Sequence, residues 1–76
     1  MTKREKIKWV NSLMEDIGMT YLGSTCNYVS LVWDEDNKRT YAIKYNKKGT
    51  PIVVNFTDLP KNEMDLIIAD LKQEFD

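Results

Sequence analysis

The middle of the chain alternates apolar and polar residues in three short segments, which are separated by two polar turns. The segments are residues 28–33, 41–45 and 52–56, and all are rich in the β-branched and aromatic side chains that suit a pleated sheet. Residues 34–39 include no apolar side chain, and Gly49 can adopt the positive φ that closes the second turn. The pattern predicts a three-stranded antiparallel meander.

Because side chains alternate along a strand, each segment has two faces. We expect one face to form the core, with the residues Val29, Leu31, Trp33, Tyr41, Ile43, Tyr45, Ile52, Val54 and Phe56. Trp33 and Phe56 are predicted to be core residues, so replacing either with alanine should cost about 3 kcal/mol or more. The opposite face then carries a mixture that an antiparallel sheet can leave in water, namely Tyr28, Ser30, Val32, Ala42, Lys44, Val53 and Asn55.

An amphipathic helix is predicted before the meander. Thr2 and Glu5 have the spacing of a capping box, in which each side chain accepts a hydrogen bond from the backbone N–H of the other residue. Apolar residues then recur at three- and four-residue steps, which places them on one stripe of a helix. Gly18 suits the position that ends this helix. A short extra strand near residues 20–24 is compatible with the sequence that follows.

A second amphipathic helix is predicted after the meander, since Pro60 suits the first position of a helix. Its buried stripe is formed by Met64, Ile67, Ile68, Leu71 and Phe75. Two such helices need the same apolar sheet face to bury against. We therefore expect residues 1–76 to form one α+β domain. It consists of an N-terminal helix, a three-stranded antiparallel meander and a C-terminal helix, with both helices on one face of the sheet.

The composition is that of a folded protein, with 42% hydrophobic and 30% charged residues. A net charge of −1 hides an acidic end, because residues 51–76 contain six Asp or Glu and two Lys or Arg. No apolar run approaches the ~20 residues of a membrane span, so no membrane contact is predicted. The single Cys26 excludes an internal disulfide and fits a reducing cytoplasm. Abundant Lys, Asn, Asp and Ile are typical of genes from AT-rich bacteria and their phages.

The residues that usually carry catalysis are scarce. General acid–base and nucleophilic catalysis rely mostly on histidine, an activated serine or cysteine, or a tuned pair of carboxylates. The chain has no histidine, and Cys26 has no base beside it in the sequence. A metal site would have to be built from carboxylates alone. We therefore predict no catalytic residue, no metal site and no cofactor.

Acidic residues gather on one side of the predicted second helix. On a helical projection Glu63, Asp70 and Glu74 form a ridge beside the buried stripe, with Leu66 next to them. Asp70 and Glu74 are like charges four residues apart near a helix C-terminus, so local stability does not explain them. An ordinary solvated face is one interpretation of this ridge. The other interpretation is a surface that binds a protein with a basic surface. We expect reversal of Asp70 and Glu74 to lysine to leave the fold intact.

The leading functional hypothesis is a small cytoplasmic inhibitor or adaptor that occupies a macromolecular partner. The predicted contacts are Glu63, Leu66, Asp70 and Glu74, with Trp9 as an aromatic anchor.

Two other functional hypotheses remain open. The order helix, three strands, helix resembles that of double-stranded RNA-binding domains, which implies contact with nucleic acid through basic residues. The candidates are Lys3, Arg4, Lys6, Lys8, Lys38, Arg39, Lys47 and Lys48. Acidic residues early in the second helix weigh against this hypothesis. The third hypothesis is a homodimer through the open sheet face, which would bury Val32, Ala42 and Val53.

Overall fold

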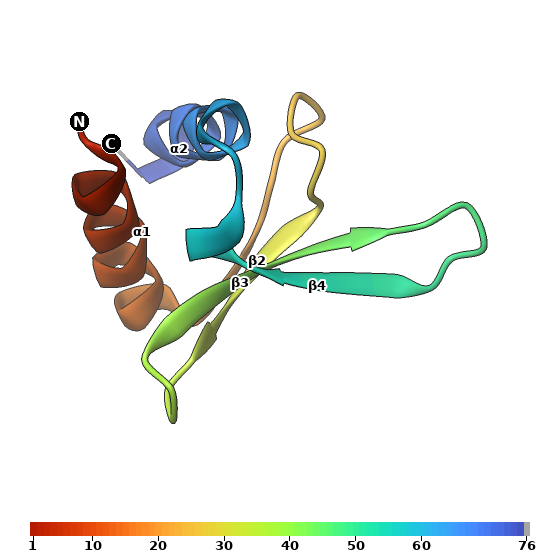
Figure 1. Ribbon diagram of the computed structural model, residues 1–76, viewed down its shortest axis with the longest axis horizontal. Helices are drawn as coiled ribbons and strands as arrows, with labels where there is room; N and C mark the ends of the chain where they lie inside the picture. Colours follow the sequence, from red (N-terminus) through yellow and green to blue (C-terminus); the bar gives the residue numbers. More distant parts are fainter. Residues whose placement is uncertain (76) are drawn as a thin grey trace.

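Two helices lie on one side of a four-stranded antiparallel sheet in the computed structural model, which describes residues 1–75 (Figure 1). The sheet order is β1-β2-β3-β4, so each strand pairs with its neighbour in sequence. The elements are α1 (Lys3–Ile17), β1 (Met19–Tyr21), β2 (Ser30–Asp34), β3 (Arg39–Tyr45), β4 (Pro51–Asn55), the 3-10 turn η1 (Phe56–Asp58) and α2 (Lys61–Phe75). The predicted α+β architecture is confirmed, and β1 is the short extra strand.

Helix α1 begins and ends at the predicted residues. The Thr2 hydroxyl accepts a hydrogen bond from the Glu5 N–H at 3.2 Å, and the Glu5 carboxylate accepts one from the Thr2 N–H at 3.0 Å. Gly18 has a φ of 79°, and its N–H donates to the Met14 carbonyl at 2.7 Å. The Gly18 carbonyl then accepts from the Trp33 N–H at 2.7 Å, which fastens the end of α1 to β2.

The core lies between the helices and the centre of the sheet. Leu31 of β2 and Ala42 of β3 are fully buried beneath the two helices. The other buried apolar residues of this cluster are Val10, Met14, Tyr28, Phe56, Leu59, Met64, Ile67, Ile68 and Leu71. Burial of one apolar face by two amphipathic helices therefore holds the layers together.

The predicted core face of β3 is wrong. Ala42 lies opposite Leu31 on one side and opposite Val54 on the other, so these three residues share the face that packs against the helices. Tyr41, Ile43 and Tyr45, which were expected in the core, point to the opposite face. Ala42 is fully buried on the helix side, where close packing leaves little room for a side chain as large as tyrosine.

The predicted burial is also wrong at the start of β2 and for part of β4. The Val29 N–H donates to the Ile43 carbonyl at 2.8 Å although Ser30 is the residue opposite Ile43, which is the arrangement of a β-bulge. A bulge reverses the alternation, so Tyr28 is buried and Val29 is exposed. Ile52 is exposed despite its inward position, since the helices do not reach that far along the hairpin.

Three other residues of the predicted core face differ in how deeply they are buried. Val54 and Trp33 are only partly buried against the core, and Phe56 is fully buried. Lys44, expected on the open face, lies on the helix side with its ammonium 5.3 Å from the centre of the Tyr28 ring.

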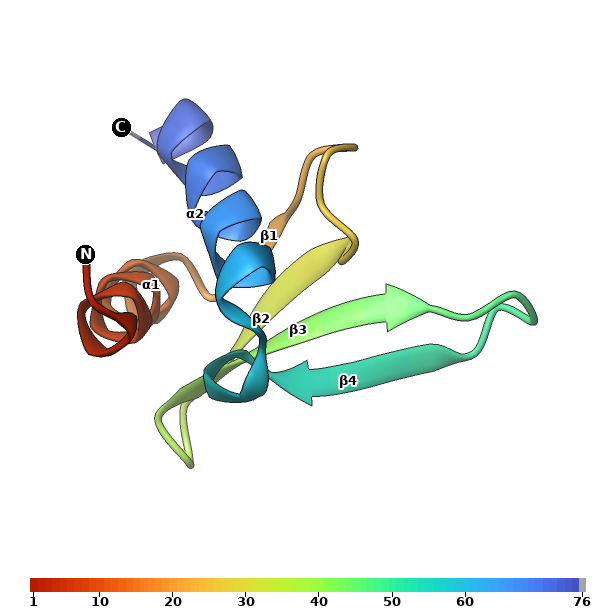
Figure 2. The ribbon, with the colours of Figure 1, turned by 45° about the horizontal axis from the view of Figure 1, so that its top comes forward.

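The outer half of the β3–β4 hairpin projects beyond the helical layer (Figure 2). Its turn is closed by the Asn46 side chain, which accepts hydrogen bonds from the Lys48 and Thr50 N–H groups at 2.9 Å each. Gly49 has a φ of 82°, as the turn requires. The hairpin thus carries side chains on both faces into solvent.

Replacing Phe56 with alanine should destabilise the fold by about 3–5 kcal/mol, because the side chain is fully buried and leaves a cavity. Chemical denaturation followed by circular dichroism measures the change. Val53→Ala is the matched control, since Val53 is 57% exposed and should lose well under half as much stability. Equal losses for the two variants would contradict the assigned core.

Candidate functional site

Two of the four residues of the predicted ridge on α2 accept hydrogen bonds within the chain. The Asp70 carboxylate accepts a hydrogen bond from the Gly23 N–H at 2.6 Å, and Glu63 accepts one from the Asn27 side chain at 3.4 Å. The loop between β1 and β2 therefore packs along the ridge. Of the four ridge residues, only Leu66 and Glu74 are exposed.

Gly23 permits this close approach. A Cβ atom at Gly23 would lie 2.2 Å from an oxygen of the Asp70 carboxylate, and no side chain can occupy that space without moving Asp70. The loop contact also includes Cys26, whose thiol donates to the Leu66 carbonyl at 3.5 Å. Burial, followed by the charge of Asp70, raises the pKa of this thiol. Reversal of Asp70 to lysine would remove this hydrogen bond, so we now expect the change to cost stability.

The basic residues of α1 do not form one surface. Lys6 is buried and pairs with Asp65 of α2, so it links the two helices. A hydrogen bond from Lys6, together with its charge, lowers the pKa of Asp65. Lys3, Arg4 and Lys8 are exposed.

Trp9 is partly buried against the core, with the Lys72 ammonium 5.8 Å from its ring centre. The predicted anchor therefore packs within the chain on one side and faces solvent on the other.

The basic residues of the two hairpin turns lie at opposite ends of β3. Lys38 pairs with Glu35 in the β2–β3 turn, and Arg39 lies opposite Asp34. Lys47 and Lys48 lie at the exposed tip of the β3–β4 hairpin. The sequence from 37 to 57 contains five basic residues and no acidic one.

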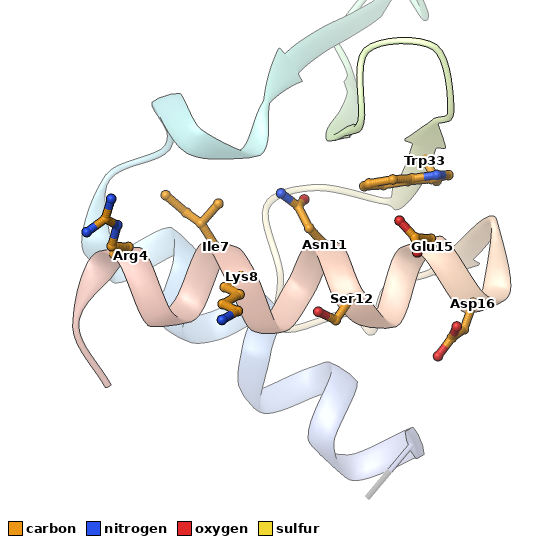
Figure 3. Close-up of a pocket in the computed structure, with 8 residues that line it drawn as sticks. All are labelled: Arg4, Ile7, Lys8, Asn11, Ser12, Glu15, Asp16 and Trp33. Carbon is orange, nitrogen blue, oxygen red and sulfur yellow. The ribbon is translucent and has the colours of Figure 1, made fainter.

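A shallow groove of about 550 Å³ runs beside α1 (Figure 3). Arg4 and Lys8 line one end, Glu15 and Asp16 the other, and the Trp33 ring lies beside the acidic end. The Trp33 indole N–H donates to Glu35 at 2.7 Å, which leaves the ring face as the groove wall. The groove is a surface depression between charged ends.

Exposed apolar side chains among residues 1–75 gather on the side of the sheet away from the helices. Strand pairing places Met19, Val32, Tyr41 and Asn55 in one cross-strand row, and Tyr21, Ser30, Ile43 and Val53 in the next. We call this surface the open face, and it comprises Met19, Tyr21, Ser30, Val32, Tyr41, Ile43, Tyr45 and Val53. Tyr21 is 71% exposed, Tyr45 58% and Met19 52%. The centre of the open face carries no charged side chain.

Charge lies at the two ends of the open face. The β2–β3 turn contributes Asp34, Glu35 and Asp36 at one end, and the hairpin tip contributes Lys47 and Lys48 at the other. The Asp34 carboxylate accepts hydrogen bonds from two backbone N–H groups and the Asn37 side chain, which lowers its pKa and holds the turn in place. The open face is therefore apolar in the middle, with two lysines at one end and, at the other, three acids beside the basic residues Lys38 and Arg39.

Sequence reasoning assigned three of these residues, Tyr41, Ile43 and Tyr45, to the core. Alternation shows that they share a face without showing which face the helices cover. Side-chain size could have indicated which face the helices cover, because Thr40 and Ala42 are small and suit a position beneath helices.

No family model, curated protein or solved structure matches this chain. Among residues 1–75, no helix has the length and apolar character to cross a bilayer. The same residues contain no group of three or more side chains of the metal-binding types that could hold an ion.

Replacing Gly23 with alanine should destabilise the fold by about 1–3 kcal/mol, because it displaces a charged hydrogen-bond acceptor. Asp70→Ala should cost a similar amount by removing the same bond. The double variant should cost little more than Asp70→Ala alone, and denaturant unfolding of the four proteins measures this coupling. Additive losses would show that the two residues act independently.

The Lys6–Asp65 pair should make stability depend on pH. The folded pKa of Asp65 is lowered, so its contribution is present above the unfolded value of about 3.9 and is lost as pH falls through the folded value. Unfolding of wild type and Asp65→Asn, measured from pH 6 down to pH 2.5, should show a difference that closes in acid. A difference that stays constant would contradict the pairing.

Proposed function

We propose that this chain is a small binding protein that occupies a partner protein with its open face and has no chemistry of its own. The supporting observation is the exposure of aromatic and aliphatic side chains across the open face. Antiparallel sheets that face water usually carry polar residues there. Contiguous exposed apolar surface of this kind marks interaction sites.

The residue types on the open face are those of protein interfaces. Tyrosine and methionine are enriched at the centres of such interfaces, whereas charged residues are depleted. Tyr21, Tyr45 and Met19 supply large contact areas, and tyrosines often dominate the binding energy. A complementary partner has an apolar centre, acidic groups against the hairpin tip and a basic group against Asp36 of the β2–β3 turn.

The ridge on α2 is the weaker candidate surface. Two of its acidic residues, Glu63 and Asp70, already accept hydrogen bonds from the β1–β2 loop. Leu66 and Glu74 remain for a partner with a basic surface. The free thiol of Cys26 supports a reducing cytoplasm as the place of action.

A second candidate function is binding of single-stranded nucleic acid. It is favoured by the five basic residues and absence of acidic ones from 37 to 57, next to three tyrosines of the open face. Bases can stack on such rings while lysines contact phosphates. Short oligonucleotides added to the protein would quench tyrosine fluorescence, and the affinity would fall as salt rises.

The proposal predicts that Val53→Glu abolishes capture of the partner from source cells, because it places a charge in the apolar centre of the open face. The partner identified with the wild type is then purified, and the affinity of each variant is measured by titration. Val53 is exposed, so the fold should survive, and circular dichroism verifies this.

Glu74→Lys on the α2 ridge is the control. It should leave capture unchanged if the open face is the interface. Capture that survives Val53→Glu and is lost in Glu74→Lys would move the interface to α2.

A further inference from the structure

We infer that the protein partner of the open face is a second copy of this chain. The inference rests on the proposed function and names its partner. Two sheets would pack through their open faces with the β3 strands antiparallel, and the helices would lie outside. The layers of the dimer would follow the order helix, sheet, sheet, helix.

The first argument is the apolar surface that a single copy leaves in water. Taking about 200 Å² for a whole tyrosine, Tyr21 and Tyr45 together expose on the order of 250 Å². Met19 and Val53 lie on the same face and are also more than half exposed. Sheets that pack face to face interdigitate side chains of this type about 10 Å apart. A chain of 76 residues also buries a smaller share of its surface than larger domains do, so added burial matters more.

The second argument is charge, because the open face is complementary to itself. Ala42 is the middle residue of β3, and Asp36 precedes it by six positions while Lys48 follows it by six. A two-fold axis in the plane between the sheets, perpendicular to the strands at this midpoint, exchanges the two ends of β3. Lys47 and Lys48 of each copy then meet Asp36 in the β2–β3 turn of the other, where Lys38 pairs with Glu35 and Arg39 lies opposite Asp34.

The opposite orientation, with the β3 strands parallel, is disfavoured. It would place the lysines of one hairpin tip over those of its partner, and like charges across an interface are unfavourable. The charges therefore select the antiparallel arrangement.

Pairing of two copies through their sheet edges is less favourable than packing of their open faces. One edge is β1, which has only three residues. The other edge is β4, which begins with Pro51 and so lacks one backbone donor. The open face offers larger side chains and a charge pattern that fits.

Sedimentation equilibrium over a range of concentrations tests the inference. The wild type should be a dimer that dissociates on dilution, and Val53→Glu should be a monomer at every concentration. Leu66→Glu is the matched control, since it places the same charge on an exposed apolar residue of α2 and should remain a dimer. A monomeric wild type, or a dimer that survives Val53→Glu, would overturn the inference.

A charge exchange tests the antiparallel arrangement. Asp36→Lys alone, and Lys47→Glu with Lys48→Glu in one chain, should each weaken the homodimer about tenfold. An equimolar mixture of these two variants should recover the wild-type affinity, because both ends of the heterodimer regain opposite charges. With parallel strands, the hairpin-tip variant would instead pair best with wild type, and that result would overturn the antiparallel arrangement. The differences should shrink at high salt.

The outcomes separate this inference from the proposed function. If the chain is monomeric and Val53→Glu still abolishes capture of another protein, the open face is an interface and only the second copy is wrong. If the chain is monomeric and oligonucleotides quench its tyrosines, the partner is nucleic acid. If Val53→Glu changes neither assembly nor capture, both proposals fail.

Discussion

The close packing of the helices on the middle of β3 is the constraint on which the other features depend. Ala42 and Leu31 fill the space beneath α1 and α2, and both are fully buried. A protein core has close to crystalline packing density, so a tyrosine at the Ala42 position would force the layers apart. The small residue lets the helices close on the sheet. It also sends Tyr41, Ile43 and Tyr45 to the other face, since neighbouring residues of a strand point in opposite directions.

A second constraint acts on the surface of α2. Glu63 and Asp70 look like free acids on a helical projection, yet both accept hydrogen bonds from the β1–β2 loop. That loop starts close to α2 only because Gly23 has no side chain to collide with Asp70. Asp70 therefore satisfies a polar group of the chain itself, which explains this acid near a helix C-terminus without a partner, whereas Glu74 is exposed.

Local features of the fold were predictable from the sequence, whereas contacts between distant residues were not. The Thr2–Glu5 capping box and the turn at Gly49 depend on residues close in sequence, and both were predicted correctly. The face of β3 depends on how close the helices lie to the sheet, which alternation does not encode. The contact between the ridge and the β1–β2 loop was not predictable for a similar reason. Gly23 and Asp70 are 47 positions apart, and no local sequence pattern indicates that they meet.

Net charge is also a poor guide to the partner of this chain. A value of −1 suggests a nearly neutral molecule, but the fold separates the charges in space. Lys6 and Asp65 neutralise each other between the helices, and Lys38 pairs with Glu35 in its own turn. Arg39 lies opposite Asp34, so what remains along the open face is Asp36 at one end and Lys47 and Lys48 at the other, about the length of β3 apart. Because screening at physiological salt acts over about 8 Å, these ends act as separate local charges. A partner that matches them must carry the same polarity in reverse, and a copy of the chain turned end to end does so.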